Sequence, residues 1–183
     1  RVSPSQINNY SCRRSRWVIE KIFGKIVTVG ASAHRGTYIE HGIKHFFDRD
    51  QLATGDIVSE AVDHGVKEFD KKCKGMDKYT EERGYIEPCI RKGIEELRKF
   101  DLMNFQLELH LDLNGYQVYG YSDFVFQGDV VSKRFVVDLK TTKRFPYKIN
   151  NQHCRQVSIY AKSLECDAKI LYLVPKKSGI VDV

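Results

Sequence analysis

The hydrophobic positions follow a helical period in the first part of the chain and a strand period in the second part. Ser3, Pro4 and Gln6 have the spacing that is typical of a capped helix start, and we expect this helix to continue to about Phe23. A second helix is predicted at about 37–48, where apolar residues recur at helical spacing.

The middle of the chain, residues 57–101, is rich in charged residues and in helix formers. Gly75 and Gly84 are predicted to interrupt the helices there. A domain usually takes ~100–200 residues, so the 183 residues suit one well-cored domain. We therefore interpret about 52–102 as a helical insertion within a single domain, 1–183.

Three strands are predicted in succession after this helical segment. The stretch at 105–113 alternates between apolar and polar residues, and the stretch at 116–126 is aromatic and β-branched. Asn114 and Gly115, which lie between them, form a dipeptide that is typical of a tight hairpin turn. A third strand is predicted at about 134–140.

A helix and one more strand complete the predicted order of elements. Residues 151–165 have a helical pattern, and the apolar run at 168–175 is typical of a short buried strand. The sequence therefore predicts a mixed α/β (α+β) fold. A three-stranded meander is followed by a helix and a strand, and the helices of residues 1–101 pack around this sheet.

Composition narrows the function classes only slightly. Lys and Arg number 30 against 24 Asp and Glu, a net charge of +6 that suits a polyanionic partner without requiring one. The most apolar segments are interrupted by charges, so no transmembrane helix or signal peptide is predicted, and we expect a cytoplasmic protein. The five cysteines are widely spaced and are interpreted as reduced thiols: Cys12, Cys73, Cys89, Cys154 and Cys166.

The predicted strand at 134–140 carries two charges inside an apolar run. Side chains alternate between the two faces of a strand, so Val137 and Leu139 point one way while Asp138 and Lys140 point the other. An exposed, favourable Asp/Lys pair is the simpler explanation of this pattern.

Asp123 makes a functional explanation stronger, because it also interrupts an apolar strand. If residues 128–133 form a six-residue loop, antiparallel pairing places Asp123 opposite Asp138. Like charges directly opposite each other destabilise a sheet, whereas a shared divalent cation would make the arrangement favourable. Carboxylate and water oxygens are ligands that suit Mg²⁺ or Mn²⁺.

Two predicted helices carry further candidate residues for this site. Gly36 and Glu40 share one helix face, so Glu40 can point at the sheet where Gly36 allows a close approach, although a plain surface position is an equally good explanation. Gln156 and Tyr160 are also four positions apart, on the flank of an apolar stripe that includes Cys154.

The order and spacing of these residues resemble a known family, the PD-(D/E)XK nuclease superfamily, and in particular its RecB-like exonuclease branch, which includes phage-encoded nucleases. The N-terminal "SPSQINNYSCRR" is similar to the first helix of that branch, with Arg13 where proline is common. The resemblance covers 3–48 and 105–175. The residues that carry it are Asp123, Asp138, Leu139, Lys140, Gln156 and Tyr160.

The resemblance implies a metal-dependent nuclease site. Asp123, Asp138 and the main-chain carbonyl of Leu139 would bind Mg²⁺ or Mn²⁺, and Lys140 would orient or help to deprotonate the attacking water. Glu40 matches the first motif of the branch, whereas its neighbour His41 is one residue out of phase. Gln156 and Tyr160 would contact the metal site or the DNA backbone.

The expected substrate is DNA with single- or double-stranded ends. Lys143, Arg144 and Lys148 follow the metal-binding strand and are expected to hold phosphates, together with Tyr160. The basic residues of the inserted helices either cover the DNA strand or simply face solvent. Some relatives hold an iron–sulfur cluster with three cysteines after the Gln/Tyr helix, but only Cys166 follows Tyr160, so we expect no cluster.

Four functions are weighed against these observations. The favoured one is an exonuclease in DNA recombination, repair or phage DNA processing. A structure-specific or restriction-type endonuclease and an inactive nucleic-acid-binding module on the same fold are the alternatives. The protein could also be an interaction protein whose acidic strand residues merely face solvent. The four-residue spacing of Gln156 and Tyr160 would then be a coincidence. Strand polarity, oligomeric state and any recombination partner are not predicted.

Overall fold

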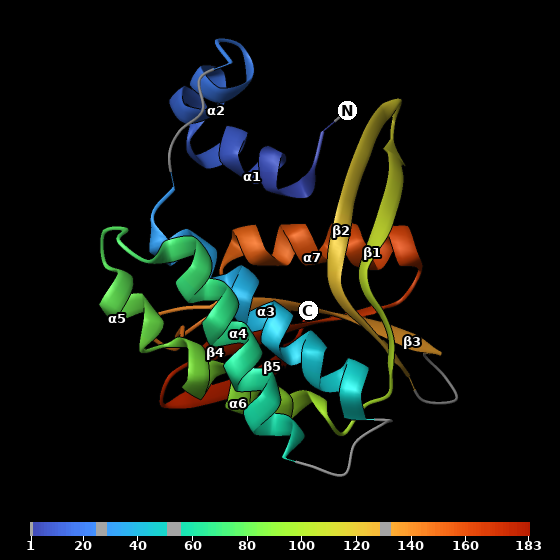
Figure 1. Cartoon of the computed structure of the whole chain (residues 1–183). Helices are drawn as coiled ribbons and strands as arrows, with labels where there is room; N and C mark the ends of the chain where they lie inside the picture. The colour runs from blue at the N-terminus through green and yellow to red at the C-terminus, as the bar shows by residue number, and fades with distance from the viewer. Residues whose placement is uncertain (1, 25–28, 51–55, 129–132) are drawn as a thin grey trace.

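The computed structural model describes residues 2–24, 29–50, 56–128 and 133–183. Within these residues, five strands form one sheet in the order β1-β2-β3-β4-β5 (Figure 1). The strands are β1 (Leu102–Leu113), β2 (Tyr116–Gln127), β3 (Arg134–Thr141), β4 (Asp167–Val174) and β5 (Lys177–Asp182). β3 and β4 are parallel, and the other neighbours are antiparallel.

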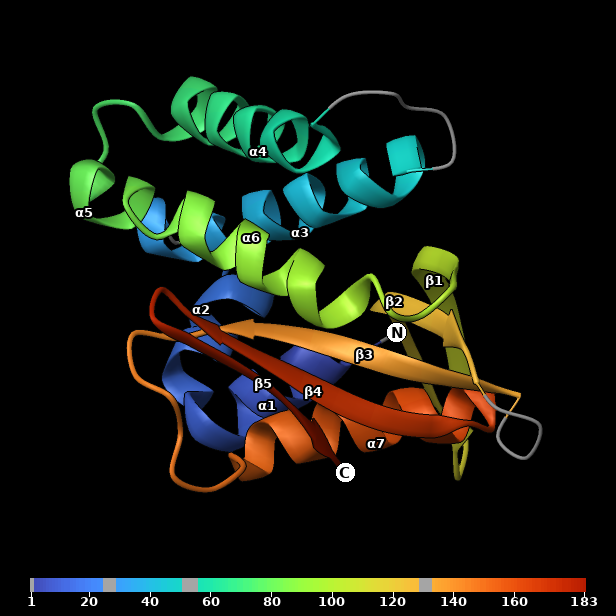
Figure 2. The ribbon, with the colours of Figure 1, turned by 90° about the horizontal axis from the view of Figure 1, so that it is seen from below.

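Helices cover both faces of this sheet, as Figure 2 shows. α3, α4 and α6 lie over one face, and α7 lies under the other face with α1 beside it. The helices are α1 (Pro4–Cys12), α2 (Arg14–Lys21), α3 (Ala31–Asp50), α4 (Ile57–Cys73), α5 (Tyr79–Arg83), α6 (Ile86–Leu97) and α7 (Asn151–Leu164). This arrangement confirms the predicted mixed α/β fold.

The alternation of side chains along β3 divides the apolar core between the two faces. Phe135, Val137 and Leu139 pack in the core shared with α3, α4 and α6. Val136 lies in the second core, which includes Val157 of α7. Both cores are made of buried side chains, and β3 is the central strand of the sheet, with one core on each of its faces.

The predicted strands are found where the pattern placed them, but β5 was not predicted. β5 follows β4 through a tight turn, because Val174 already pairs with Lys177. Its sequence is short and contains Gly179, whose hypothetical Cβ would lie 3.0 Å from the Phe145 ring. Hydrogen bonds to β4, rather than its own residue pattern, make this segment a strand.

Two helix predictions need correction. The expected helix from Ser3 to about Phe23 is broken at Arg13, whose φ of −144° and ψ of 53° are not helical. The second helix begins at Ala31 rather than near residue 37, because the segment before Gly36 consists of residues that tolerate a helix. The capping box at Ser3 is present as predicted.

The middle segment contains the helices that were expected. Gly75 follows α4 with φ of +88°, a conformation that favours glycine, and Gly84 lies between α5 and α6. Residues 52–55 of the predicted insertion lie outside the described residues, as do residue 51 before it and residues 129–132 of the loop between β2 and β3.

Candidate active site

β3 presents an acidic and a basic side chain on its α7 face. Asp138 is fully buried, and the Lys140 side chain is 20% exposed. Lys140 Nζ lies 2.5 Å from Asp138 Oδ2. The two charges therefore form an ion pair inside the molecule rather than the exposed pair that the simpler explanation requires.

The β2–β3 register is the one that the loop length predicted. Phe124 pairs with Val137, so Asp123 and Asp138 are the next opposed positions beyond the end of the ladder. Asp123 Oδ2 accepts a hydrogen bond of 2.7 Å from the Leu139 main-chain N–H. A side chain of β2 thus takes the place of a ladder hydrogen bond at the point where the two strands separate.

Both carboxylate oxygens of Asp138 are buried, and neither has a partner with hydrogen-bond geometry, although Lys140 is close to one of them. Burial raises the pKa of Asp138, and the Lys140 ammonium opposes this shift. Burying a charged group without hydrogen bonds costs free energy, so binding of a cation or a hydrogen-bond donor to these two oxygens would be favourable.

Glu40 brings a third carboxyl group toward the same place. Burial raises the pKa of Glu40 to about 9; the charges of Asp123 and Asp138 also raise it, whereas Lys140 lowers it. Burial, together with the charge of Asp138, raises the pKa of Asp123 to about 7, although Lys140 and the hydrogen bond from Leu139 oppose this shift. α3 therefore places Glu40 close enough to the two strand carboxylates for their charges to shift its pKa.

The structure also separates Glu40 from its neighbour His41. His41 packs against aromatic rings, 5.8 Å from Tyr38 and 6.5 Å from Phe105 between ring centroids, and burial lowers its pKa. A hypothetical Cβ on Gly36 would lie 3.6 Å from Thr141 Oγ1, which is an ordinary contact. α3 does approach β3 closely at Gly36, but this approach does not require glycine.

Three carboxyl groups around one ammonium also determine the charge state of Lys140. Burial lowers the pKa of Lys140, but Asp138, Asp123 and Glu40 outweigh it, and the net shift is upward. Lys140 is therefore a stable cation in this arrangement, rather than the amine of lowered pKa that its burial alone would produce.

α7 places a hydrogen-bonded pair at the other side of the cluster. Gln156 Nε2 donates to Tyr160 Oη at 2.6 Å, and Tyr160 is buried. Burial raises the pKa of Tyr160, while the hydrogen bond from Gln156 lowers it and the charges of Asp138, Asp123 and Glu40 raise it. Gln156 and Tyr160 thus act as one unit whose phenol group lies near the acidic cluster.

His153 is a neighbour of this site that the sequence analysis missed. Its Nδ1 lies 2.9 Å from Tyr172 Oη, and burial, together with the charge of Lys140, lowers its pKa to about 4. His153, Gln156 and Tyr160 are spaced three and four positions apart, so they share one helix face. That spacing is the signal that could have identified His153.

Comparison with known proteins identifies the family to which this fold belongs. A family model described as the PD-(D/E)XK nuclease superfamily matches residues 1–179. The chain belongs to this superfamily. This membership supports nuclease activity and implies a nucleic acid substrate.

Two solved structures resemble this PD-(D/E)XK protein at low sequence identity. A crystal structure named "Putative exonuclease" from Eubacterium rectale has a TM-score of 0.61 and 13% identity, covering 100% of this chain and 72% of that one. The crystal structure of SSO0001 has a TM-score of 0.43 and 12% identity, covering 90% of this chain and 72% of that one. No curated protein sequence matches. The first likeness supports the fold.

PD-(D/E)XK nucleases typically use divalent metal ions, and the donors around β3 fit such an ion. Within the described ranges, no group of three or more His, Cys, Asp and Glu side chains is arranged so that it could hold a metal ion by itself. The protein donors at this point are instead two Asp carboxylates and main-chain oxygen, and the Asp138 oxygens accept no hydrogen bond although one is ion-paired with Lys140. Oxygen donors of this kind are those that Mg²⁺ and Mn²⁺ take.

The basic residues predicted to hold phosphates follow β3 but differ in their surroundings. Lys143 Nζ lies 2.5 Å from Glu81 Oε1 and 3.7 Å from Glu82 Oε1, so acidic residues of α5 already surround it. Arg144 and Lys148 are exposed. In the part of the chain that the structure describes, no helix is both long and apolar enough to cross a membrane.

Proposed function

We propose that this protein is a Mg²⁺- or Mn²⁺-dependent deoxyribonuclease that hydrolyses phosphodiester bonds at DNA ends. The observation that carries the proposal is the meeting of Asp123, Asp138 and Lys140 at the point where β2 and β3 separate, with Asp138 buried and neither of its oxygens hydrogen-bonded, although one forms an ion pair with Lys140. We assign the activity to one domain, 1–183, in which about 52–102 is a helical insertion.

Each residue has a distinct role in this proposal. Asp123 and Asp138, with the Leu139 main-chain carbonyl, would hold the metal ion, and Glu40 would complete the set. The bound ion would neutralise the scissile phosphate and lower the pKa of a coordinated water. Lys140 orients the attacking water and stabilises the negative charge that develops on the phosphorus oxygens.

Gln156 and Tyr160 complete the site from α7. The hydrogen bond between them orients the phenol group, and the pair would contact either the metal-bound water or the DNA backbone. Lys143, Arg144 and Lys148 would hold phosphates beside the scissile bond, since they follow β3 directly. Lys143 would exchange Glu81 for a phosphate group when DNA binds.

The choice of exonuclease rests on two likenesses. The motifs resemble the RecB-like exonuclease branch, and a structure of the same fold is named "Putative exonuclease". The proposed biological setting is DNA recombination, repair or phage DNA processing in the cytoplasm.

The test is DNA degradation by the purified protein with Mg²⁺, with Mn²⁺ and with EDTA. We expect activity only with metal, and we expect Asp138→Ala and Lys140→Ala to abolish it while circular dichroism shows an intact fold. Asp63→Ala on α4 and Lys162→Ala on α7 change the same residue types at exposed positions and serve as matched controls. Full activity of Asp138→Ala would refute the site.

The substrate form distinguishes the favoured function from its alternatives. Linear DNA, single- and double-stranded, should be degraded, whereas covalently closed circles should persist. Cleavage of closed circles would instead identify an endonuclease. Binding of DNA without cleavage under every metal condition would identify an inactive binding module.

A further inference from the structure

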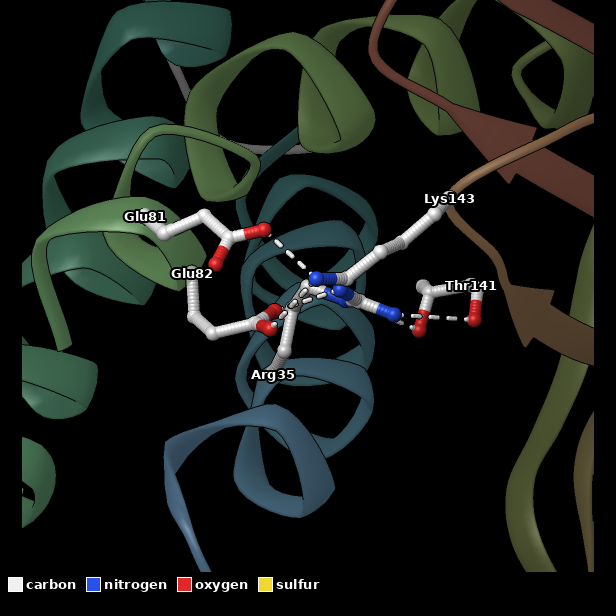
Figure 3. Close-up of polar contacts among 5 residues, drawn as sticks. All are labelled: Arg35, Glu81, Glu82, Thr141 and Lys143. Carbon is white, nitrogen blue, oxygen red and sulfur yellow. Dashed lines mark hydrogen bonds and ion pairs between the residues drawn. The ribbon is translucent and has the colours of Figure 1, made fainter. Parts of the chain in front are cut away.

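Arg35 and Glu82 form a buried ion pair between α3 and α5 that the proposed mechanism does not use (Figure 3). Arg35 is 7% exposed and Glu82 is fully buried. Arg35 Nη1 donates to Glu82 Oε2 at 2.5 Å, and the guanidinium lies 5.2 Å from the centroid of the Tyr85 ring. Taking two charges out of water is costly, so such a pair indicates a specific structural role.

The remaining donors of Arg35 reach the end of β3, as Figure 3 shows. Nη2 donates to the Thr141 main-chain carbonyl at 3.1 Å, and Nε lies 3.4 Å from Thr141 Oγ1. Thr141 directly follows Lys140. The planar guanidinium therefore connects an acidic residue of the inserted helices to the main chain beside the proposed catalytic lysine.

These contacts occur where β3 is no longer paired with β2, although it remains paired with β4. The ladder between β2 and β3 ends at the Phe124–Val137 pair. Main-chain groups of alternate residues point to the same edge of a strand, so Leu139 and Thr141 both face the β2 side. The Thr142 N–H agrees with this alternation, because it bonds to Leu173 on the β4 side.

Along this open edge, two side chains replace the main-chain hydrogen bonds that β2 would otherwise make. Asp123 accepts the Leu139 N–H, and two residues further on Arg35 donates to the Thr141 carbonyl. Lys140 lies between these two anchors. Asp123 is itself a proposed metal ligand, whereas Arg35 contacts only Thr141 and the inserted helices in the hydrogen bonds and ion pair described above.

We propose that Arg35, oriented by Glu82, is a positioning residue for phosphodiester hydrolysis: it holds the main chain at Thr141 and thereby fixes the Lys140 ammonium beside Asp138. The inference rests on the proposed nuclease function for its catalytic consequence, but not for its structural one. It also assigns a role to α5, because Glu82 of this helix orients the Arg35 guanidinium.

The test removes both charges together, because a single substitution would leave its partner buried and unpaired. The Arg35→Met/Glu82→Leu double variant keeps side chains of roughly similar volume. It removes the longer Lys143–Glu82 contact of 3.7 Å but leaves the Lys143–Glu81 ion pair in place. Arg35→Lys is the conservative variant: it keeps the charge but lacks the fork that can hold Glu82 and Thr141 at once.

A matched control is another ion pair of α5, in which Arg83 Nε lies 2.8 Å from Asp70 Oδ1. The Arg83→Gln/Asp70→Asn variant removes this pair between α4 and α5 without touching β3. All variants are compared with the wild type by urea denaturation, so that only folded proteins enter the comparison.

Amide hydrogen exchange is measured on the metal-free proteins, which makes it independent of nuclease activity. In Arg35→Met/Glu82→Leu we expect faster exchange of the amides at 139–142 and unchanged exchange at 135–137, which remain paired with β2. Unchanged exchange at 139–142 in this folded variant would overturn the proposal.

Steady-state kinetics on linear DNA tests the catalytic consequence. We expect kcat of the double variant to fall about 10- to 100-fold, with KM nearly unchanged, because the lysine is displaced while the phosphate contacts remain. Arg35→Lys should retain part of the lost kcat, and the control pair should behave as the wild type. Faster exchange with an unchanged kcat would overturn the positioning role. A wild-type protein that does not cut DNA would instead refute the proposed function.

Discussion

Replacement of a predicted active-site carboxyl group should stabilise the metal-free protein. Burial and the nearby Asp123 raise the pKa of Glu40 from 4.5 in an exposed setting to about 9 in the folded protein. Between these values the folded state binds more protons than the unfolded state, so stability falls as the pH rises. Glu40→Gln keeps the shape of the protonated acid and removes this proton linkage.

The magnitude follows from the width of the pH window. Between pH 4.5 and pH 7, an interval of about 2.5 pH units, Glu40 is ionised in the unfolded chain but still protonated in the folded protein. This difference lowers the free energy of unfolding at pH 7 by about 3 kcal/mol. Because Glu40 is only partly buried, solvent screening reduces this effect, and we expect Glu40→Gln to be about 2 kcal/mol more stable than the wild type. Below pH 4.5 the two proteins should be equally stable.

The assay is urea denaturation at pH 4.5, 6, 7 and 8 in EDTA, with the free energy of unfolding extrapolated to water. Glu95→Gln, at an exposed position of α6, is the matched control and should show no pH-dependent difference. A Glu40→Gln variant whose stability difference is the same at pH 4.5 and at pH 7 would refute the reasoning. Added Mn²⁺ should reduce the advantage of the variant, because the ion favours the ionised acid.

Three further predictions test the packing and the site. A Cβ at Gly65 would lie 3.0 Å from a main-chain oxygen of α3, so Gly65→Ala should lower the free energy of unfolding by about 1–3 kcal/mol in urea denaturation. Gly30→Ala is the control, because a Cβ at Gly30 meets open space and should leave this free energy unchanged. Tyr160→Phe removes the hydroxyl that accepts from Gln156 and should lower kcat about tenfold at unchanged thermal stability; an unaltered kcat would contradict a catalytic role for the phenol. Lys148→Ala should raise KM for DNA. The slope of the DNA-binding constant against salt concentration, on logarithmic axes, should also decrease by the amount expected for about one phosphate contact, and an unchanged slope would exclude this contact.

Local patterns were sufficient for most elements and for the chemistry of β3. The alternation of apolar and charged residues identified which face carries Asp138 and Lys140, because the period of a strand is a property of the chain itself. The length of the β2–β3 loop was sufficient to predict the register, and the helical spacing of Gln156 and Tyr160 placed them on one face. The two boundary errors, at Arg13 and Ala31, occur where no strong capping signal is present.

Only the tertiary structure decided how these residues influence one another. The raised pKa values of Glu40 and Asp123 result from burial against groups more than 80 positions away or on another strand, so no local pattern could reveal them. The pairing of Lys143 with Glu81 and the contact of Arg35 with Thr141 likewise join segments that are distant in sequence. β5 became a strand for the same reason, since its hydrogen bonds come from β4.

The sequence by itself thus predicted the fold class, the order of the elements apart from β5 and the break between α1 and α2, and the acidic, basic and amide side chains that we propose for the candidate site. Periodicity and turn residues act over a few positions, so they can be recognised in a single chain. Long-range packing determined which carboxyl groups are protonated, which lysine is already paired and which arginine holds the end of β3. Burial and electrostatic coupling depend on three-dimensional distance, and these properties appear only when the chain is folded.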